Sequence, residues 1–145
     1  MIDWTGRRAE TPELSISYVR AGRGEPVIFL HGWPEWKRSW LHNLPALSEH
    51  FDCIAPDFRG FGATVLKTSR SESGTPPQLL AKDLRDFIDL LGLEKISIVS
   101  HDVGSFVAQQ FALAWPERVG RLFFFNCAYP GIGQRWGDWQ LFPET

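Results

Sequence analysis

Short apolar runs and longer amphipathic segments alternate along most of the chain, separated by polar and glycine-rich stretches. Apolar runs bounded by turn residues are typical of strands, and an apolar stripe with helical spacing is typical of a helix. The pattern predicts strands over residues 14–20, at a sheet edge, and over 27–30, 52–55, 96–99 and 119–125. It predicts helices over 36–48, interrupted or ended near Pro45, and over 78–91 and 105–115.

The order of these elements predicts the fold class. The helix over 78–91 has a single apolar stripe, and Gly92 follows it as a helix-ending residue. Residues 64–77 are polar and contain Ser, Gly and Pro, so we expect a surface loop there. Strands that alternate with helices indicate an α/β fold, a mostly parallel sheet with helices on both faces. We find no repeat and no linker, and we assign residues 1–145 to one domain.

The most informative motif follows the strand predicted over 96–99, and it reads Ser100-His101-Asp102-Val103-Gly104. Small residues stand two places before and two places after Asp102, where a strand gives way to a helix. This is the spacing of a nucleophile elbow, the sharp turn that lifts one side chain out of a sheet. An aspartate is ionised near neutral pH, so unlike a serine it needs no base to attack. Ser100 lacks such small neighbours and is not a rival.

A structural interpretation of Asp102 competes with the catalytic one. An Asp directly before a helix is commonly an N-cap, whose carboxylate accepts hydrogen bonds from the first helix amides. The catalytic interpretation therefore depends on other parts of the same machinery. Two are present upstream. The run 26–30 ends in His31-Gly32-Trp33-Pro34-Glu35, and the run 51–56 ends in Asp57-Phe58-Arg59-Gly60-Phe61-Gly62.

Together with the elbow, these motifs resemble the α/β-hydrolase fold, and within it the epoxide hydrolases and their haloalkane dehalogenase relatives. The resemblance covers nearly the whole chain, with three motifs in the same order and separation. It implies that Asp102 is the nucleophile and that the backbone N–H groups of Trp33 and Val103 form the oxyanion hole. It also implies a cis bond before Pro34. Supporting roles fall to His31, Gly32, Pro34 and Gly104.

None of the four histidines is expected to be the general base. We interpret His31 as a structural residue of the oxyanion loop. His101 should point away from the cleft, because it directly precedes Asp102. His42 and His50 lie in or just after a polar segment and are expected on the surface.

Composition excludes several classes of function. The net charge of −2 over 145 residues indicates neither nucleic acid nor an acidic membrane as partner. There is no membrane-spanning apolar run and no signal-peptide core, so we expect a cytoplasmic protein. Cys53 and Cys127 are expected to be buried thiols, and neither a metal site nor a cofactor is indicated. Three clustered tryptophans, at positions 33, 36 and 40, either line an apolar pocket or pack a helix.

The resemblance also implies that the chain is truncated before the lid and the last strands. In the family, a helical lid with two tyrosines follows the sixth strand, and later strands carry the relay acid and the general-base histidine. By that analogy residues 1–125 form core sheet and helices, and residues 126–145 start the lid region. Tyr18 and Tyr129 do not stand at the lid positions. We expect the missing C-terminal half, or a second chain, to complete the enzyme, and the chain by itself to be inactive.

Three functions stay open at this point. Hydrolysis of a small apolar epoxide to a diol, through an alkyl-enzyme ester, ranks first. A haloalkane dehalogenase-like or other α/β-fold hydrolase ranks second. Those dehalogenases usually carry a tryptophan after the nucleophile, whereas the side chain of Val103 cannot donate a hydrogen bond to a halide. A non-catalytic fragment, folded against a partner that covers its sheet edge, is the third.

Overall fold

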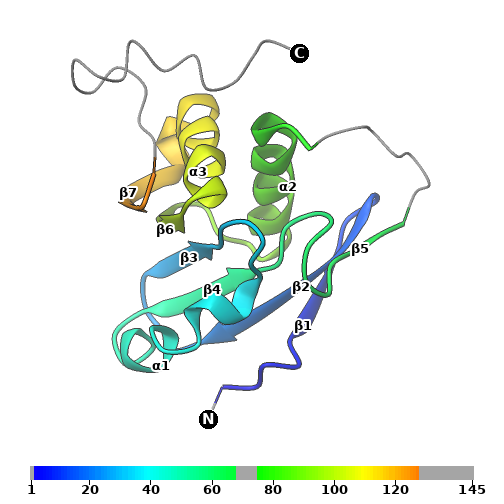
Figure 1. Cartoon of the computed structure of the whole chain (residues 1–145). Coiled ribbons are helices and arrows are strands. Elements are labelled where there is room, and N and C mark those ends of the chain that lie inside the picture. The colour runs from blue at the N-terminus through cyan, green and yellow to red at the C-terminus, as the bar shows by residue number, and fades with distance from the viewer. Residues whose placement is uncertain (1, 68–74, 128–145) are drawn as a thin grey trace.

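The computed structural model describes residues 2–67 and 75–127, which form one sheet flanked by helices (Figure 1). The strands are β1 (Arg7–Glu10), β2 (Leu14–Ala21), β3 (Pro26–Leu30), β4 (Asp52–Pro56), β5 (Val65–Leu66), β6 (Ile96–His101) and β7 (Val119–Phe125). Their order is β1-β2-β4-β3-β6-β7, and β5 pairs with β2. Strands β4, β3, β6 and β7 are parallel to one another, whereas β1, β2 and β5 form antiparallel pairs.

The prediction that residues 14–20 form an edge strand is wrong in its position. The strand exists, but β2 lies between β1 and β4, and β5 pairs with its first residues. No sequence pattern indicated β1, because Ala9 alone of its four residues is buried, opposite Ile16. A strand with one buried side chain has no alternating pattern to detect.

Helices cover both faces of the sheet, as predicted. On one face α2 (Pro77–Leu90) packs against α3 (Val103–Ala114), and on the other lie the 3₁₀-helix η1 (Lys37–Trp40) and α1 (Leu44–Leu47) (Figure 1). Strand β3 contributes to both cores. Its Ile28 and Leu30 pack with α2 and α3, whereas its Phe29 packs with Trp40. Successive side chains of a strand point to opposite faces, so a wholly apolar strand needs cover on both.

The helix predicted over 36–48 is wrong. Trp36 has an extended backbone (φ −156°, ψ 179°), a single 3₁₀ turn follows it, and Pro45 stands in the first turn of the short α1. Proline lacks an N–H, so it is tolerated in a first turn but not inside a helix. The backbone N–H of Lys37 donates to the carboxylate of Asp57 over 2.7 Å. The segment therefore forms two short helical turns, and the hydrogen bond to Asp57 fixes the backbone at Lys37, where the first of them begins.

The remaining elements follow the predictions closely. The strands over 27–30, 52–55 and 119–125 and the helix over 78–91 are confirmed, and Gly92 ends α2 with a φ of +68°. The strand predicted over 96–99 continues to residue 101 and α3 begins at residue 103, two residues earlier than predicted. A 3₁₀ turn, η2 (Pro116–Arg118), joins α3 to β7. The tight turn between β6 and α3 is therefore a single residue, Asp102.

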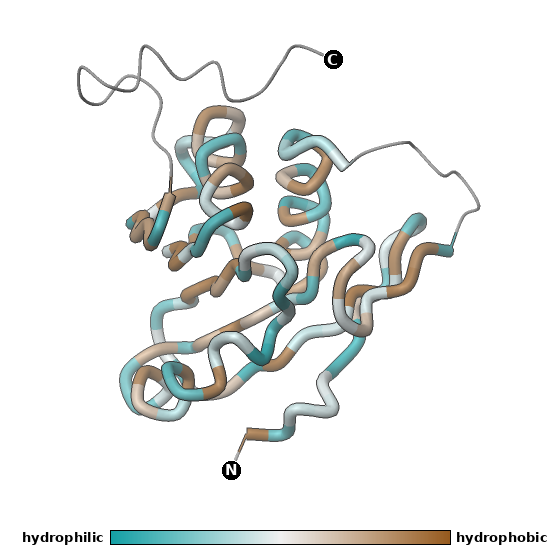
Figure 2. The backbone as a smooth tube through the Cα atoms, in the orientation of Figure 1, coloured by the Kyte–Doolittle hydropathy of each residue, from teal (hydrophilic) through white to brown (hydrophobic). Residues whose placement is uncertain are grey.

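Two predicted segments extend beyond the described residues. The surface loop over 64–77 contains β5 and ends where α2 begins, and its residues 68–74 lie outside the described ranges. The lid start expected over 126–145 lies outside them from residue 128 onward, and so does Tyr129. Figure 2 shows hydrophobic and hydrophilic positions alternating along α2, as in an amphipathic helix. No helix in the described ranges is long and apolar enough to cross a membrane.

Candidate active site

Asp102 forms the turn between β6 and α3 in a backbone conformation that few residues adopt. Its φ is +49° and its ψ is −119°. Such a conformation costs free energy in a non-glycine residue and persists only where the surroundings enforce it. The amide of Asp102 donates to Phe125 O over 3.2 Å, and Asp102 O accepts from the amide of Ser105 over 2.9 Å. Neighbouring strand and following helix thus hold the turn.

The carboxylate of Asp102 makes no capping hydrogen bond to α3. The N-cap interpretation therefore does not describe this aspartate. Instead, Asp102 Oδ1 accepts a hydrogen bond from the backbone N–H of Trp33 over 3.1 Å, across 69 residues of sequence. The carboxylate is aimed at the loop after β3 and not at the amides of its own helix.

Small residues are needed where β3, β6 and α3 meet. A Cβ on Gly104 would lie 2.6 Å from Leu30 O and 2.7 Å from His31 O. A Cβ on Gly32 would lie 2.8 Å from Asp102 Cβ. Real Cβ atoms do not make such close contacts with backbone atoms in packed interiors. The elbow and the loop after β3 can approach each other only because both positions are glycine.

Buried serine hydroxyls lie behind the elbow. Ser105 Oγ donates to Ser100 Oγ over 3.1 Å, and Ser100 Oγ donates to Phe123 O over 3.2 Å. These two hydrogen bonds link α3, β6 and β7. Ser100 is fully buried and engaged, which accords with its dismissal as a nucleophile.

The loop from residue 31 to residue 36 brings the Trp33 amide to the carboxylate. The peptide bond between Trp33 and Pro34 is cis, as predicted. The indole of Trp33 is 67% exposed, so its backbone and not its side chain is held in place. Val103 is the first residue of α3, and amides in a first helical turn have no partner within the helix. The Trp33 amide thus contacts the Asp102 carboxylate and Val103 follows Asp102 in sequence, while their role as an oxyanion hole stays a prediction.

His31 is a buried link between two loops. Its Nδ1 donates to Gly32 O over 2.8 Å, and its Nε2 accepts from the amide of Phe58 over 3.1 Å. Burial lowers the pKa of the ring, chiefly by penalising the charged form. Both ring nitrogens are thus used in structural bonds, in agreement with the structural interpretation.

The His101 ring lies against the start of the loop after β3, where a Cβ on Gly32 would be 3.0 Å from its Nδ1. Its Nδ1 lies 3.1 Å from Glu35 Oε2, which also accepts from the amide of Gly32 over 2.9 Å. Burial raises the pKa of Glu35, but the Gly32 and His101 hydrogen bonds outweigh it, so the net shift is downward. A charged Glu35 therefore joins the loop of residues 31–36, called the oxyanion loop below after its expected role, to His101, the residue before Asp102.

An apolar groove of about 480 Å³ lies next to this pair, lined by Phe29, Trp40, Phe123, Phe125 and His101, among others. Of the three clustered tryptophans, Trp40 alone lines it.

His42 and His50 are exposed, as predicted. Tyr18 is buried against Phe87, with ring centroids 5.1 Å apart, and therefore belongs to the core and not to a lid. Cys53 is buried and its thiol pKa is raised to about 11 by that burial, whereas Cys127 is partly exposed.

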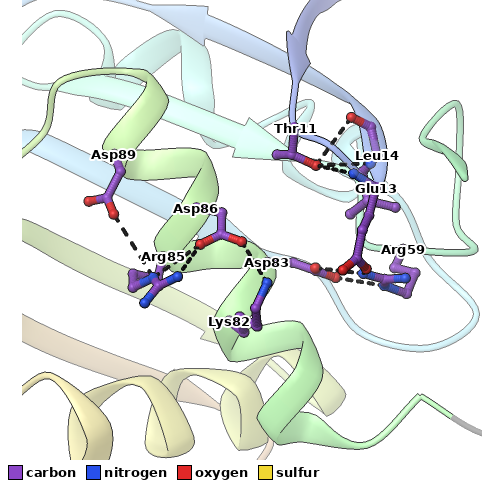
Figure 3. A network of polar contacts seen from close by, with 9 residues as sticks. All are labelled: Thr11, Glu13, Leu14, Arg59, Lys82, Asp83, Arg85, Asp86 and Asp89. Atoms are coloured by element: carbon purple, nitrogen blue, oxygen red, sulfur yellow. Dashed lines mark hydrogen bonds and ion pairs between the residues drawn. The ribbon is translucent and has the colours of Figure 1, made fainter. Parts of the chain in front are cut away.

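Several polar groups that no sequence pattern indicated lie around the site. Lys37 is buried and pairs with the buried Asp57 over 2.7 Å. Arg59 pairs with Asp83 of α2 and with Glu13, each over 2.8 Å, so that it ties the loop after β4 to the helix (Figure 3). The Asp83 hydrogen bond is the largest cause of the raised pKa of Arg59. No pattern revealed Lys37, because lysine is rarely buried and its partner is 20 residues away.

No group of three or more His, Cys, Asp or Glu side chains within residues 2–67 and 75–127 is arranged to hold a metal ion.

The chain is similar to known proteins in sequence and in fold. A family model described as the alpha/beta hydrolase fold matches residues 25–142. The chain is 38% identical over 117 residues to the soluble epoxide hydrolase of Corynebacterium sp. (strain C12), covering 81% of this chain and 39% of that protein. The crystal structure of epoxide hydrolase VrEH1 from Vigna radiata superposes with a TM-score of 0.81 at 31% identity, covering 92% of this chain and 42% of that one.

A third relative carries a different name. The chain is 34% identical over 114 residues to the cis-3-alkyl-4-alkyloxetan-2-one decarboxylase of Shewanella oneidensis, covering 77% of this chain and 35% of that protein. The chain thus spans about two fifths of the length of the relatives it matches. The predicted α/β-hydrolase fold, incomplete with respect to these relatives, is confirmed.

Proposed function

The chain belongs to the alpha/beta hydrolase fold family, and on that premise we propose that it carries the attacking half of an epoxide hydrolase site. Asp102 is the nucleophile, and the amides of Trp33 and Val103 form the oxyanion hole. The observation that carries the proposal is the 3.1 Å hydrogen bond from the Trp33 amide to Asp102 Oδ1, made at a residue whose φ is +49°. A backbone donor aimed at a carboxylate held in a strained turn supports a catalytic role over a capping one.

The proposed reaction has two steps. In the first, Asp102 Oδ2 attacks an epoxide carbon, the ring C–O bond breaks, and the released oxygen takes up a proton, which leaves a hydroxyalkyl ester. In the second, a water attacks Cγ of that ester while a base accepts its proton. Negative charge then develops on Oδ1, the atom that already faces the Trp33 amide. Collapse of this intermediate breaks the Cγ–Oδ2 bond, the departing alkoxide takes the proton from the base to complete the diol, and Asp102 returns to a carboxylate by releasing its carboxyl proton.

The base for the second step is assigned to a histidine that is not among these 145 residues. His31 has both ring nitrogens in structural bonds, and His42 and His50 are exposed. His101 Nδ1 is paired with Glu35. We therefore propose that further polypeptide, in the same chain or in a second one, supplies the base, the relay acid and the groups that protonate the epoxide oxygen. A small apolar epoxide is the proposed substrate.

Isotope labelling tests the proposal. The protein is prepared in its native host, so that any polypeptide that completes the site is retained, and is given styrene oxide in water labelled with ¹⁸O. Diol should form, and ¹⁸O should enter the peptide that contains Asp102, because the attacking water oxygen stays on the carboxylate. In freshly prepared Asp102→Ala, turnover should fall by about 10⁴-fold or more.

The control variant is Asp89→Asn, which changes an exposed carboxylate on α2 and should keep full turnover. Undiminished turnover by Asp102→Ala would refute the assignment, and so would label that enters the diol but never the protein. Absence of both diol and label from the wild-type protein would favour the non-catalytic alternative.

Dehalogenation is the second candidate, and Val103 argues against it. Its side chain has no donor for a departing halide, and an epoxide needs none because its oxygen stays on the product. Halide release from a 1-haloalkane, followed with a pH indicator, should therefore be slower than diol formation. Halide release that outpaces diol formation would reverse the ranking.

A further inference from the structure

Lys37 and Asp57 form an ion pair inside the protein, directly behind the oxyanion loop. The Lys37 side chain is 1% exposed and that of Asp57 is fully buried. Lys37 Nζ donates to Asp57 Oδ2 over 2.7 Å and to Ser17 Oγ of β2 over 3.0 Å. Two charges removed from water repay their desolvation only with good geometry and further hydrogen bonds.

The Asp57 carboxylate supplies those further bonds to the backbone of two loops. Its Oδ1 accepts the amide of Lys37 over 2.7 Å, and its Oδ2 accepts the amide of Ala63 over 2.9 Å. Gly62, with a φ of +54°, is wrapped so tightly around the carboxylate that any Cβ there would overlap it. The Asp57 backbone is fixed to β2 in turn, since its amide donates to Ser17 O over 2.8 Å.

The oxyanion loop is thus held at both ends. At its start, Glu35 accepts the amide of Gly32 and contacts His101. At its end, Asp57 holds the amide of Lys37. The Trp33 amide, which meets Asp102, lies between these two anchors.

We propose that the buried Lys37–Asp57 pair is a positioning device, which sets the Trp33 amide against Asp102 and so acts on the hydrolysis of the ester more than on its formation. The proposal rests on the function proposed above. Asp57 is the anchor, because only a carboxylate accepts the Lys37 and Ala63 amides together. Lys37 neutralises that anchor where water cannot.

The two chemical steps should respond differently to a displaced amide. During attack, Oδ1 of Asp102 loses negative charge, so a weaker donor does not slow this step. During hydrolysis, Oδ1 gains negative charge, so the same loss raises the barrier. A defect in positioning therefore predicts accumulation of the ester, whereas general unfolding predicts loss of both steps together.

The decisive variant replaces the pair by apolar residues, Lys37→Met with Asp57→Leu. Exchange of a buried ion pair for apolar residues of similar volume commonly preserves stability, whereas removal of one partner does not. We expect the double variant to unfold at a lower midpoint, because the Lys37 and Ala63 amides lose their acceptor, but in its folded state to form the ester at the wild-type rate and to hydrolyse it about 10- to 100-fold more slowly. Rapid-quench mass spectrometry of the Asp102 peptide measures both steps. Lys95→Met, an exposed lysine before β6, is the control and should match the wild type.

A second readout needs no turnover. Hydrogen exchange of the Trp33 amide in substrate-free full chain should be at least about tenfold faster in the double variant, because its hydrogen bond to Asp102 is no longer enforced. Ser17→Ala, which removes one acceptor of Lys37 Nζ, should shift this rate in the same direction by a smaller factor. It serves if the double variant fails to fold.

The outcomes separate this proposal from the proposed function. Unchanged Trp33 exchange in every folded variant would overturn the positioning role, whether or not the protein hydrolyses epoxides. Equal slowing of both chemical steps would also overturn it. Faster exchange in a protein that never forms an ester would support the positioning role for the amide and refute the epoxide chemistry instead.

Discussion

The loops around Asp102 and the face beside β7 are neighbouring regions of one sheet. They differ in whether their buried polar groups have hydrogen-bond partners and whether their apolar side chains are covered. Around Asp102, the buried His31, Lys37 and Asp57 all have hydrogen-bond partners within the described chain. Beside β7, Phe123 and Phe125 are 60% and 58% exposed, and they border the groove lined by Trp40. The Trp40 indole N–H is buried there without an acceptor among the residues that the structure describes.

This difference separates two kinds of interaction. Hydrogen bonds and ion pairs are directional, and a buried polar group without a partner is costly, so the loops that carry the site are ordered by contacts within this chain. Apolar side chains, in contrast, gain stability whenever their surface is removed from water, whichever apolar group covers it. The polar region should therefore be sensitive to small changes of shape, and the β7 face should tolerate them.

The largest expected effect compares one substitution in the two regions. Gly104→Ala should lower the free energy of unfolding by about 3 kcal/mol, since its Cβ would press on backbone carbonyls that cannot rotate away. Gly120→Ala on β7 should change it by less than about 0.5 kcal/mol, because its nearest neighbour is the Ser97 hydroxyl at 3.2 Å, which can turn. Denaturant unfolding of both variants measures the difference. Equal costs would remove the distinction between the regions.

A pH effect of intermediate size should come from His31. Burial lowers its pKa below the 6.5 of the unfolded chain, so as the pH falls the unfolded state binds the proton first. The stabilisation is complete above pH 6.5 and is lost below it, by at most about 1.4 kcal/mol per pH unit. The His31→Gln variant should lack this component in unfolding curves between pH 7.5 and 5, whereas the exposed His50→Gln should retain it. Parallel curves for wild type and His31→Gln would contradict the prediction.

The smallest effect is expected on the β7 face itself. Phe123→Ala should change the free energy of unfolding by less than about 0.5 kcal/mol, because this ring is mostly in water already. Phe124→Ala, its neighbour, should cost more, because that ring packs against the core under α3. The pair is compared by thermal or denaturant unfolding. A large cost at Phe123 would show that the exposed face is covered in solution.

Much of the fold was predictable because it depends on local pattern. The wholly apolar β3, the short apolar runs in β4 and β6, the amphipathic α2 and the glycine after it all have sequence signals that their own residues carry. The three motifs were predictable for the same reason, since a strand followed by small residues and one polar side chain indicates a turn at the carboxyl end of a sheet. The cis bond before Pro34 came from the resemblance alone.

The errors had a common cause. The helix expected over 36–48 was replaced by short turns because a carboxylate from a distant loop holds the Lys37 amide. The edge strand became an inner one because the polar β1 added to it. In both places a partner remote in sequence decided the local structure.

The amino-acid sequence alone thus determined which residues form five of the strands, β2, β3, β4, β6 and β7, where the chain turns sharply, and that an aspartate stands at the sharpest turn. Only the tertiary structure decided what that aspartate faces. The hydrogen bond from Trp33 and the burial of Lys37 against Asp57 join segments 69 and 20 residues apart. Propensity and periodicity act over a few residues, whereas the satisfaction of buried polar groups depends on whichever segments the packed sheet brings together.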